Sequence, residues 1–151
     1  MTGKDRKFKN ILFTTDFSEA SVHAASYAAS LARSYNAAVH VLHVVDTSEE
    51  AAGFYLPHLS FEKLDAELKD TAGAMLKKFC EKNFKAHEGL KATVVAGEPY
   101  KEILKAAAGA DVIVMGTFGK KGHLDRLLFG STTERVMRMA KCPVLVVPPA
   151  E

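Results

Sequence analysis

The sequence predicts an α/β protein with an open five-stranded parallel sheet that carries helices on both faces. Short apolar runs of strand length alternate along the chain with longer segments of helical period, in the order βαβαβαβαβ. The apolar runs are nearly continuous rather than alternating, which is typical of parallel strands covered by helices on both sides. The length of 151 residues suits one hydrophobic core, so residues 1–151 are expected to form a single domain.

The expected strands are rich in Val, Ile and Leu, and cover residues 11–13, 39–45, 90–95, 111–115 and 143–147. The expected helices cover residues 18–35, 61–85, 97–108 and 131–140, with loops at 47–60 and 116–130. Asn36 provides a stop for the first helix, and Pro99 suits the first turn of the third. The apolar stripes of the first two helices include Tyr35 and Met75, which are therefore expected to face the core.

Composition excludes several classes of protein. An apolar content of 48% and a net charge of +2 are unlike a disordered chain and argue against a nucleic-acid partner. No apolar stretch is long enough to span a membrane, and no signal peptide is recognisable. Cys80 and Cys142 belong to no disulfide framework or metal-binding cluster, which favours a reducing compartment. We expect a cytoplasmic protein without a membrane partner.

Polar residues follow three of the expected strands. These segments are Thr14 to Ser18, Val44 to Asp46, and Met115 to Gly119. In open parallel sheets, ligands bind beside the carboxyl ends of the strands, at the point where the strand order reverses. The three segments are therefore expected to line a ligand site.

The loop at 116–130 has features of a phosphate-binding loop. Gly116 and Gly119 let the backbone turn sharply, and Gly130-Ser131 opens a helix whose first amides point to any bound anion. The loop is basic. Four of its residues carry or can carry positive charge, Lys120, Lys121, His123 and Arg126, against one acidic residue, Asp125.

The same residues fit a structural interpretation that needs no ligand. Ser131-Thr132-Thr133-Glu134 has the spacing of a capping box, and Asp16 stands where it could cap the first helix. Neither the GxxxxGK[ST] loop nor a GxGxxG turn after the first strand is present. The chemistry of the residues alone thus leaves ligand binding and helix capping both open.

Several segments together resemble the universal stress protein family over nearly the whole chain. They are Ile11-Leu12-Phe13-Thr14-Thr15-Asp16-Phe17-Ser18, Leu42-His43-Val44-Val45-Asp46, Val114-Met115-Gly116-Thr117-Phe118-Gly119, Gly130-Ser131 and Cys142-Pro143-Val144-Leu145-Val146-Val147. The resemblance implies a Rossmann-like fold of the adenine nucleotide alpha hydrolase type. Nucleotide-binding members of the family share the pattern G-x2-G-x9-G-[ST], and members that lack it do not bind ATP.

The resemblance implies a site for ATP, accompanied by Mg²⁺ on the phosphates, and a role as a nucleotide-dependent sensor or switch in the stress response. The implied nucleotide-binding residues are Thr14, Thr15, Asp16, Val44, Met115, Gly116, Gly119, Gly130, Ser131 and Thr132. Asp16 would accept a hydrogen bond from the ribose, the backbone of Val44 would contact the adenine, and the glycines with Ser131 and Thr132 would surround the phosphates. No catalytic base or arginine finger is recognisable, so any ATP hydrolysis is expected to be slow.

The spacing in the loop departs from the family pattern by one residue. Ten residues, 120–129, separate Gly119 from Gly130. This leaves an alternative, a dimeric stress-response module that binds no nucleotide because its phosphate loop is closed. A third hypothesis is an enzyme that acts on a small phosphorylated metabolite through Lys120, Lys121 and Arg126.

Other interpretations are weaker. His40 and His43 lie on opposite faces of one strand and have no ligand-spaced partner, which disfavours a metal site. No GxSxG elbow is present for a serine hydrolase. The last strand, Val144 to Val147, is apolar and expected at the edge of the sheet, where another chain can pair with it. The resemblance implies a homodimer through this strand, and the regulatory protein partner is not indicated.

Overall fold

The structure is a computed structural model that describes residues 4–48, 61–85, 87–117 and 129–151, with the backbone alone for residues 61–65. The strands are β1 Asn10–Thr14, β2 Ala38–Asp46, β3 Leu90–Gly97, β4 Val112–Gly116 and β5 Val144–Val147. The helices are α1 Glu19–Tyr35, α3 Phe61–Asn83, α4 Pro99–Ala106 and α5 Ser131–Met139. Within these residues, no helix is both long and apolar enough to cross a membrane.

The five strands form one parallel sheet in the order β3-β2-β1-β4-β5, which confirms the predicted fold class. From β1 the chain moves outward through β2 to β3, and then returns to the other side of β1 to form β4 and β5. The strand order therefore reverses between β1 and β4. The carboxyl ends of these two central strands mark the place where such sheets bind ligands.

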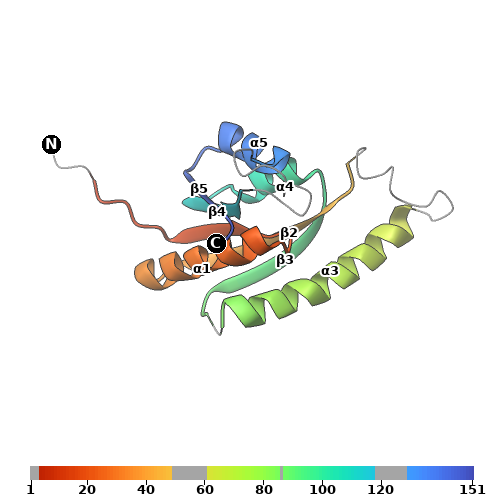
Figure 1. Cartoon of the computed structure of the whole chain (residues 1–151), viewed down its shortest axis with the longest axis horizontal. Helices are drawn as coiled ribbons and strands as arrows, with labels where there is room; N and C mark the ends of the chain where they lie inside the picture. The colour runs from red at the N-terminus through yellow and green to blue at the C-terminus, as the bar shows by residue number, and fades with distance from the viewer. Residues whose placement is uncertain (1–3, 49–60, 86, 118–128) are drawn as a thin grey trace.

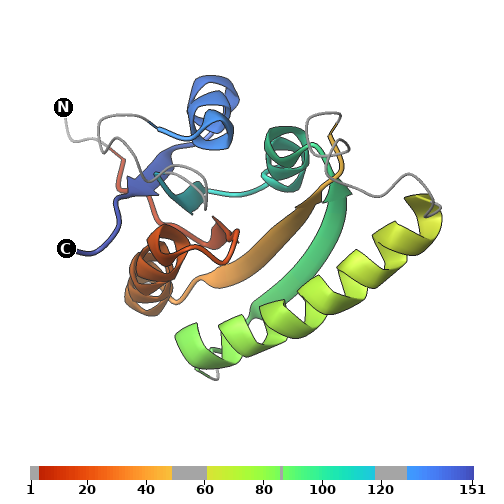
Figure 2. The ribbon, with the colours of Figure 1, turned by 45° about the vertical axis from the view of Figure 1, so that its right-hand side comes forward.

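Helices cover both faces of the sheet (Figures 1 and 2). α1 and α3 lie on one face, and α4 and α5 lie on the other. A hydrophobic core lies on each face of the sheet. Alternate residues of β1 are buried in one core or the other, because successive side chains of a strand point to opposite faces. Ile11 and Phe13 are buried with α1 and α3, whereas Leu12 is buried with α4 and α5.

Two residues that the sequence analysis placed in the core are exposed instead. Tyr35 is the last residue of α1, and 42% of it is accessible to solvent while its ring packs edge-on against Phe8 at 5.1 Å. Met75 is also 42% exposed, because its neighbour Leu76 takes the inward position of α3. The inward face of α1 consists of alanines, which lets the helix lie close to the sheet: Ala24, Ala25, Ala28 and Ala32.

Candidate functional site

The turn between β1 and α1 is held by a directed chain of hydrogen bonds. The amide of Phe17 donates to Thr15 Oγ1 at 2.9 Å, and Thr15 Oγ1 lies 2.8 Å from Ser21 Oγ. Ser21 Oγ in turn donates to the carbonyl of Ser18 at 2.9 Å, so the proton between the two hydroxyls belongs to Thr15. Thr15 and Ser21 are both buried. The hydroxyl of Thr15 is thus used inside the turn.

Phe17 occupies a left-handed backbone conformation, with φ of 65°. This conformation costs a non-glycine residue about 1–3 kcal/mol and persists only where surrounding contacts hold it. Its ring packs against His43 in a tilted arrangement, with the ring centroids 4.4 Å apart, and meets Phe79 edge-on at 6.0 Å. Together with the hydrogen bond from the Phe17 amide to Thr15, these contacts from β2 and α3 hold the turn in place.

His43 also holds the turn from the side of β2. Its Nδ1 lies 2.7 Å from the carbonyl oxygen of Thr15, and a carbonyl can only accept, so Nδ1 is the donor. The sequence analysis considered His43 only as half of an improbable metal pair. Its role depends on a contact across two strands that no local pattern reveals.

Asp16 is half-buried at the tip of this turn. Its Oδ1 accepts a hydrogen bond from the amide of Ser18 at 2.9 Å. Ser18, and not Asp16, is the N-cap of α1, and its side chain accepts from the amide of Ser21. The capping interpretation of Asp16 was therefore wrong. The described residues offer no hydrogen bond to the second oxygen, Oδ2, which remains able to accept one from a ligand.

Gly116 joins the first turns of two helices at the end of β4. A Cβ at Gly116 would lie 3.0 Å from Ala20 Cβ and 3.2 Å from the amide nitrogen of Ser21, both in the first turn of α1. The carbonyl of Gly116 accepts a hydrogen bond from Thr133 Oγ1, in the first turn of α5, at 2.9 Å. The absence of a side chain at Gly116 thus brings the N-termini of α1 and α5 to the same strand end.

The N-terminus of α5 has no side-chain cap. Gly130 is the N-cap residue, and Ser131 is already the first helical residue. Because Gly130 and not Ser131 holds the N-cap position, the capping-box interpretation of residues 131–134 was also wrong. The hydroxyl of Thr133 donates instead to the carbonyl of Gly116. The first amides of α5 lie at the positive end of its dipole, and no side chain among the described residues pairs with them. Such an end suits an anion.

Thr117 lies between the end of β4 and the start of α5. Its amide donates to the carbonyl of Val147 at 3.2 Å, and its carbonyl accepts from the amide of Gly130 at 2.9 Å. Its Oγ1 is fully buried and has no hydrogen-bond partner in the part of the chain that the structure describes. A buried hydroxyl without a hydrogen-bond partner costs about 1–3 kcal/mol. Thr117 Oγ1 is therefore a second polar group near α5 to which a ligand can offer a hydrogen bond.

The structure places the predicted site residues on three neighbouring strands and one helix. Thr14, Thr15 and Asp16 lie at the end of β1, Val44 lies near the end of β2, Met115 and Gly116 end β4, and Gly130, Ser131 and Thr132 begin α5. Thr14 and Met115 are buried, whereas Ser131 is exposed and Thr132 is half-buried. Gly119, Lys120, Lys121, His123 and Arg126 lie outside the described residues.

The first cation along α5 is engaged by α4. Arg135 Nη1 lies 3.3 Å from Glu98 Oε1, and its guanidinium stands 4.9 Å from the ring centre of Tyr100. Glu98 also pairs with Lys101 at 2.7 Å, and this hydrogen bond raises the pKa of Lys101. These contacts tie α4 to α5 and keep Arg135 away from the start of α5.

The two histidines of β2 both contact protein atoms. His40 Nε2 lies 2.7 Å from Thr93 Oγ1 on β3, and burial, followed by the nearby charge of Lys91, lowers the pKa of His40. Among the residues that the structure describes, no group of three His, Cys, Asp or Glu side chains is arranged to hold a metal ion.

Comparisons with known proteins agree with this fold. The model of the universal stress protein family matches residues 7–148 of the chain. Universal stress protein MJ0531 of Methanocaldococcus jannaschii is 40% identical over 145 residues, which cover 93% of this chain and 82% of that protein.

Solved structures of the family superpose on nearly the whole chain. The structure of MJ0577 from M. jannaschii has a TM-score of 0.76 at 32% identity and covers 97% of this chain and 99% of its own. Universal stress protein UspA from Lactobacillus plantarum has a TM-score of 0.74 at 30% identity, with 95% and 99% of the two chains covered. The match extends across the sheet, its helices and the carboxyl edge described above, and this chain belongs to the universal stress protein family.

Proposed function

We propose that this protein binds ATP at the carboxyl edge of its sheet and acts as a nucleotide-dependent sensor or switch in the stress response. The uncapped N-terminus of α5 at the reversal point between β1 and β4 carries this proposal. Its first amides, which no described side chain caps, supply donors for phosphate oxygens, and Gly130 adds no side chain in front of them.

The other residues of the edge suit the rest of a nucleotide. Asp16 Oδ2 is available to a ribose hydroxyl, while Oδ1 is held by Ser18. Val44, near the end of β2, offers a half-buried apolar surface for the adenine. The buried Thr117 Oγ1 beside α5 gains a partner if a phosphate or its loop reaches it.

The same fold holds adenine nucleotides in other proteins. A universal stress protein in complex with cAMP has a TM-score of 0.68, and one from Archaeoglobus fulgidus in complex with dAMP has a TM-score of 0.60. Their identities to this chain are 23% and 20%, which show a shared fold alone. The proposal therefore rests on the residues of this chain.

The arrangement favours binding over turnover. The described residues around α5 supply amides and hydroxyls for the phosphates, so Mg²⁺ would bind through the phosphates and water rather than in a carboxylate cage. Arg135 is held by Glu98 and Tyr100, and no other group in the described part of the site is positioned as a base for the attacking water. Slow hydrolysis at most is expected.

Native mass spectrometry of the purified protein, before and after addition of Mg-ATP, tests the proposal. We expect about one adenine nucleotide per chain. Gly130→Val is expected to weaken ATP binding at least tenfold in a calorimetric titration with an unchanged circular dichroism spectrum, because φ of −62° and ψ of 154° suit any residue. Gly73→Ala is the control for a glycine substitution far from the site, because Gly73 lies within α3 and a Cβ there meets no described atom within 4 Å.

The outcome separates the proposed function from its alternative. Unchanged affinity in Gly130→Val would show that the phosphates bind elsewhere. A wild-type protein that ignores Mg-ATP would instead favour a nucleotide-free module, with the ten-residue spacing between Gly119 and Gly130 as the cause.

We further propose that the protein is a homodimer that pairs through β5. This strand lies at an edge of the sheet, and three of its four residues are half-buried. The amides of Ile113 and Thr117 donate to the carbonyls of Pro143 and Val147, so by alternation the backbone groups of Val144 and Val146 point away from β4. They are available to a second copy of the strand.

Val146→Pro removes one outward amide and leaves the pairing with β4 in place, since proline is tolerated at a free strand edge. We expect a dimer for the wild type and for the control Val146→Ala, and a monomer for Val146→Pro, by sedimentation velocity. A Val146→Pro protein that stays dimeric would place the interface on another surface.

A further inference from the structure

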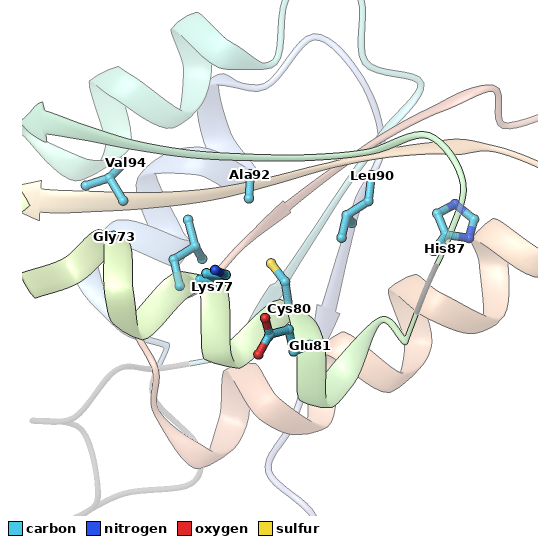
Figure 3. A pocket seen from close by; sticks show the side chains of 9 residues that line it. Gly73, Lys77, Cys80, Glu81, His87, Leu90, Ala92 and Val94 are labelled. Atoms are coloured by element: carbon cyan, nitrogen blue, oxygen red, sulfur yellow. The ribbon is translucent and has the colours of Figure 1, made fainter. Parts of the chain in front are cut away.

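An apolar groove runs between α3 and the edge strand β3, far from the carboxyl ends of β1 and β4 (Figure 3). Its volume of about 520 Å³ is within the usual range for small-molecule sites. On the side of α3 its walls are Gly73, Leu76, Lys77, Cys80 and Glu81, and on the side of β3 they are His87, Leu90, Ala92 and Val94.

The groove exists because small residues stand where larger ones would complete the packing. Gly73 lies in the middle of a 23-residue helix, where glycine is less favourable than alanine. A Cβ at Gly73 would meet no atom of the described residues within 4 Å, so no described contact requires the glycine. Ala92 on the facing strand leaves further space. The space at these two positions leaves room for a ligand.

Cys80 contributes to the apolar lining. Its sulfur points from α3 toward the sheet in Figure 3, and the residue is 8% exposed. Burial, and then the charge of Glu81, raise the pKa of the Cys80 thiol, which stays neutral near pH 7. A neutral thiol behaves as a small hydrophobic group.

His87 lines both this groove and a second cavity of about 480 Å³, which has a different character. Three cations line this second cavity, Arg33, Lys82 and Lys85, against the single carboxylate of Glu88. Among the described residues, none of the three cations forms an ion pair. Arg33 and Lys82 also balance the dipoles of the helices that end there, whereas Lys85 lies beyond the end of α3 and adds further charge.

We propose that the apolar groove and the basic cavity together bind an unbranched fatty acid, with its acyl chain between α3 and β3 and its carboxylate among the three cations. Along α3 the groove extends about 12 Å from Gly73 to Glu81, at 1.5 Å per helical residue. An aliphatic chain suits an apolar groove of this length, and His87, which lines both cavities, lies where the chain would end and the carboxylate begin. This site is separate from the nucleotide site and does not depend on it.

Titration calorimetry with octanoate, decanoate and dodecanoate, all below their micelle concentrations, tests the acyl-chain part. One fatty acid is expected to bind per chain. Affinity should rise about fourfold for each added methylene and level off when the chain outgrows the groove. Native mass spectrometry of the same samples reports the stoichiometry.

Gly73→Leu fills the groove from within. The new side chain enters open space and removes a helix-destabilising glycine, so the protein is expected to fold and to be at least as stable as the wild type. Dodecanoate affinity should fall at least tenfold. Ala74→Leu is the matched control, because it adds the same side chain at the next position, which is exposed.

The charge part is tested with the double variant Lys82→Gln and Lys85→Gln. Binding of decanoate should weaken at least fivefold, and binding of decanol, which has the same chain without a charge, should not change. Bound dodecanoate should also slow alkylation of Cys80 at alkaline pH, while Cys142 on the other face of the sheet serves as an internal control.

Several results would overturn the proposal. They are the absence of dodecanoate binding to the wild type, equal losses in Gly73→Leu and Ala74→Leu, or binding to phospholipid vesicles without binding to monomeric dodecanoate. A dimer that dissociates in Gly73→Leu, with no effect of dodecanoate, would show instead that a second copy of the chain covers the groove.

Discussion

The two halves of the candidate nucleotide site, the turn after β1 and the start of α5, differ in how their polar groups are hydrogen-bonded. In the turn after β1, the amide of Phe17 and the hydroxyls of Thr15 and Ser21 are all paired within the chain. At the start of α5, Gly130 provides no cap, and Thr117 Oγ1 is buried without a described partner. The turn after β1 thus needs no ligand to complete its hydrogen bonds, whereas the start of α5 has polar groups that no described residue pairs.

The difference shows how one edge of the sheet can combine a rigid turn with a helix start that is open to a ligand. A turn that satisfies its own hydrogen bonds can hold a strained residue such as Phe17 and present Asp16 in one position. A helix start that leaves its amides unpaired gains most when an anion arrives. Gly116 joins the halves, because it contacts α1 on one side and Thr133 of α5 on the other. The comparison leads to four predictions.

Thr15→Val should have the largest effect on stability. It keeps the shape of the side chain, leaves the amide of Phe17 without its acceptor, and removes the hydrogen bond that Thr15 donates to Ser21 Oγ, while Ser21 keeps its bond to the carbonyl of Ser18. We expect a loss of about 2 kcal/mol in the free energy of unfolding, measured by urea denaturation. The exposed serine of the same helix, in Ser26→Ala, should cost little. A cost below that of Ser26→Ala would mean that the turn is not held by this network.

Asp16→Ala should have a smaller effect on the fold and a clear effect on the ligand. The variant loses the hydrogen bond from the amide of Ser18, worth about 1 kcal/mol. ATP affinity by calorimetry should fall about tenfold, since a charge-assisted hydrogen bond to the ribose is lost. A variant that loses stability and binds ATP as tightly as the wild type would leave Asp16 a purely structural role.

Gly130→Asp should act in the opposite direction on stability. An aspartate at the N-cap satisfies a free amide of α5 and places a negative charge at the positive end of its dipole. We expect a gain of about 0.5–1 kcal/mol in urea denaturation together with a loss of ATP binding. Gly130→Asn caps the helix without the charge and should retain more affinity. A loss of stability in both variants would contradict the description of an uncapped helix.

His40 should produce the smallest effect, visible only as a dependence on pH. Because folding lowers the pKa of His40, the unfolded chain binds the proton more tightly, and acid therefore favours unfolding. Stability should fall as the pH drops below about 6.5, the ordinary value for histidine. His40→Gln keeps a polar group near Thr93 and should make this fall less steep. Identical pH profiles would exclude His40 as a source of acid sensitivity.

Sequence patterns predicted the elements well because the signals that define them are local. The apolar runs located all five strands, and Asn36, which adopts a left-handed conformation after α1, ended the first helix where expected. Sequence patterns were less reliable in predicting whether a single residue at the edge of a helix's apolar face points toward the core. Met75 and Leu76 are adjacent and both apolar, and only the packing of α3 decides that Leu76 points inward.

The caps show the same limit. Asp16 and residues 131–134 had the spacing of helix caps, but the structure assigns the caps to Ser18 and Gly130. A cap depends on where the backbone first turns helical, and this point is set by contacts such as the bond from Thr133 to Gly116. His43 was missed for a related reason, since its partner Thr15 lies 28 residues away on the neighbouring strand.

The sequence by itself determined the fold class, the order of strands and helices, and the segments that follow β1, β2 and β4, because periodicity and turn residues act over a few neighbours. Only the tertiary structure decided which polar groups are already paired, which helix start is left open, and where α3 and β3 fail to fill the space between them. These properties depend on side chains far apart in the chain, and their contacts exist only once the sheet and helices have packed.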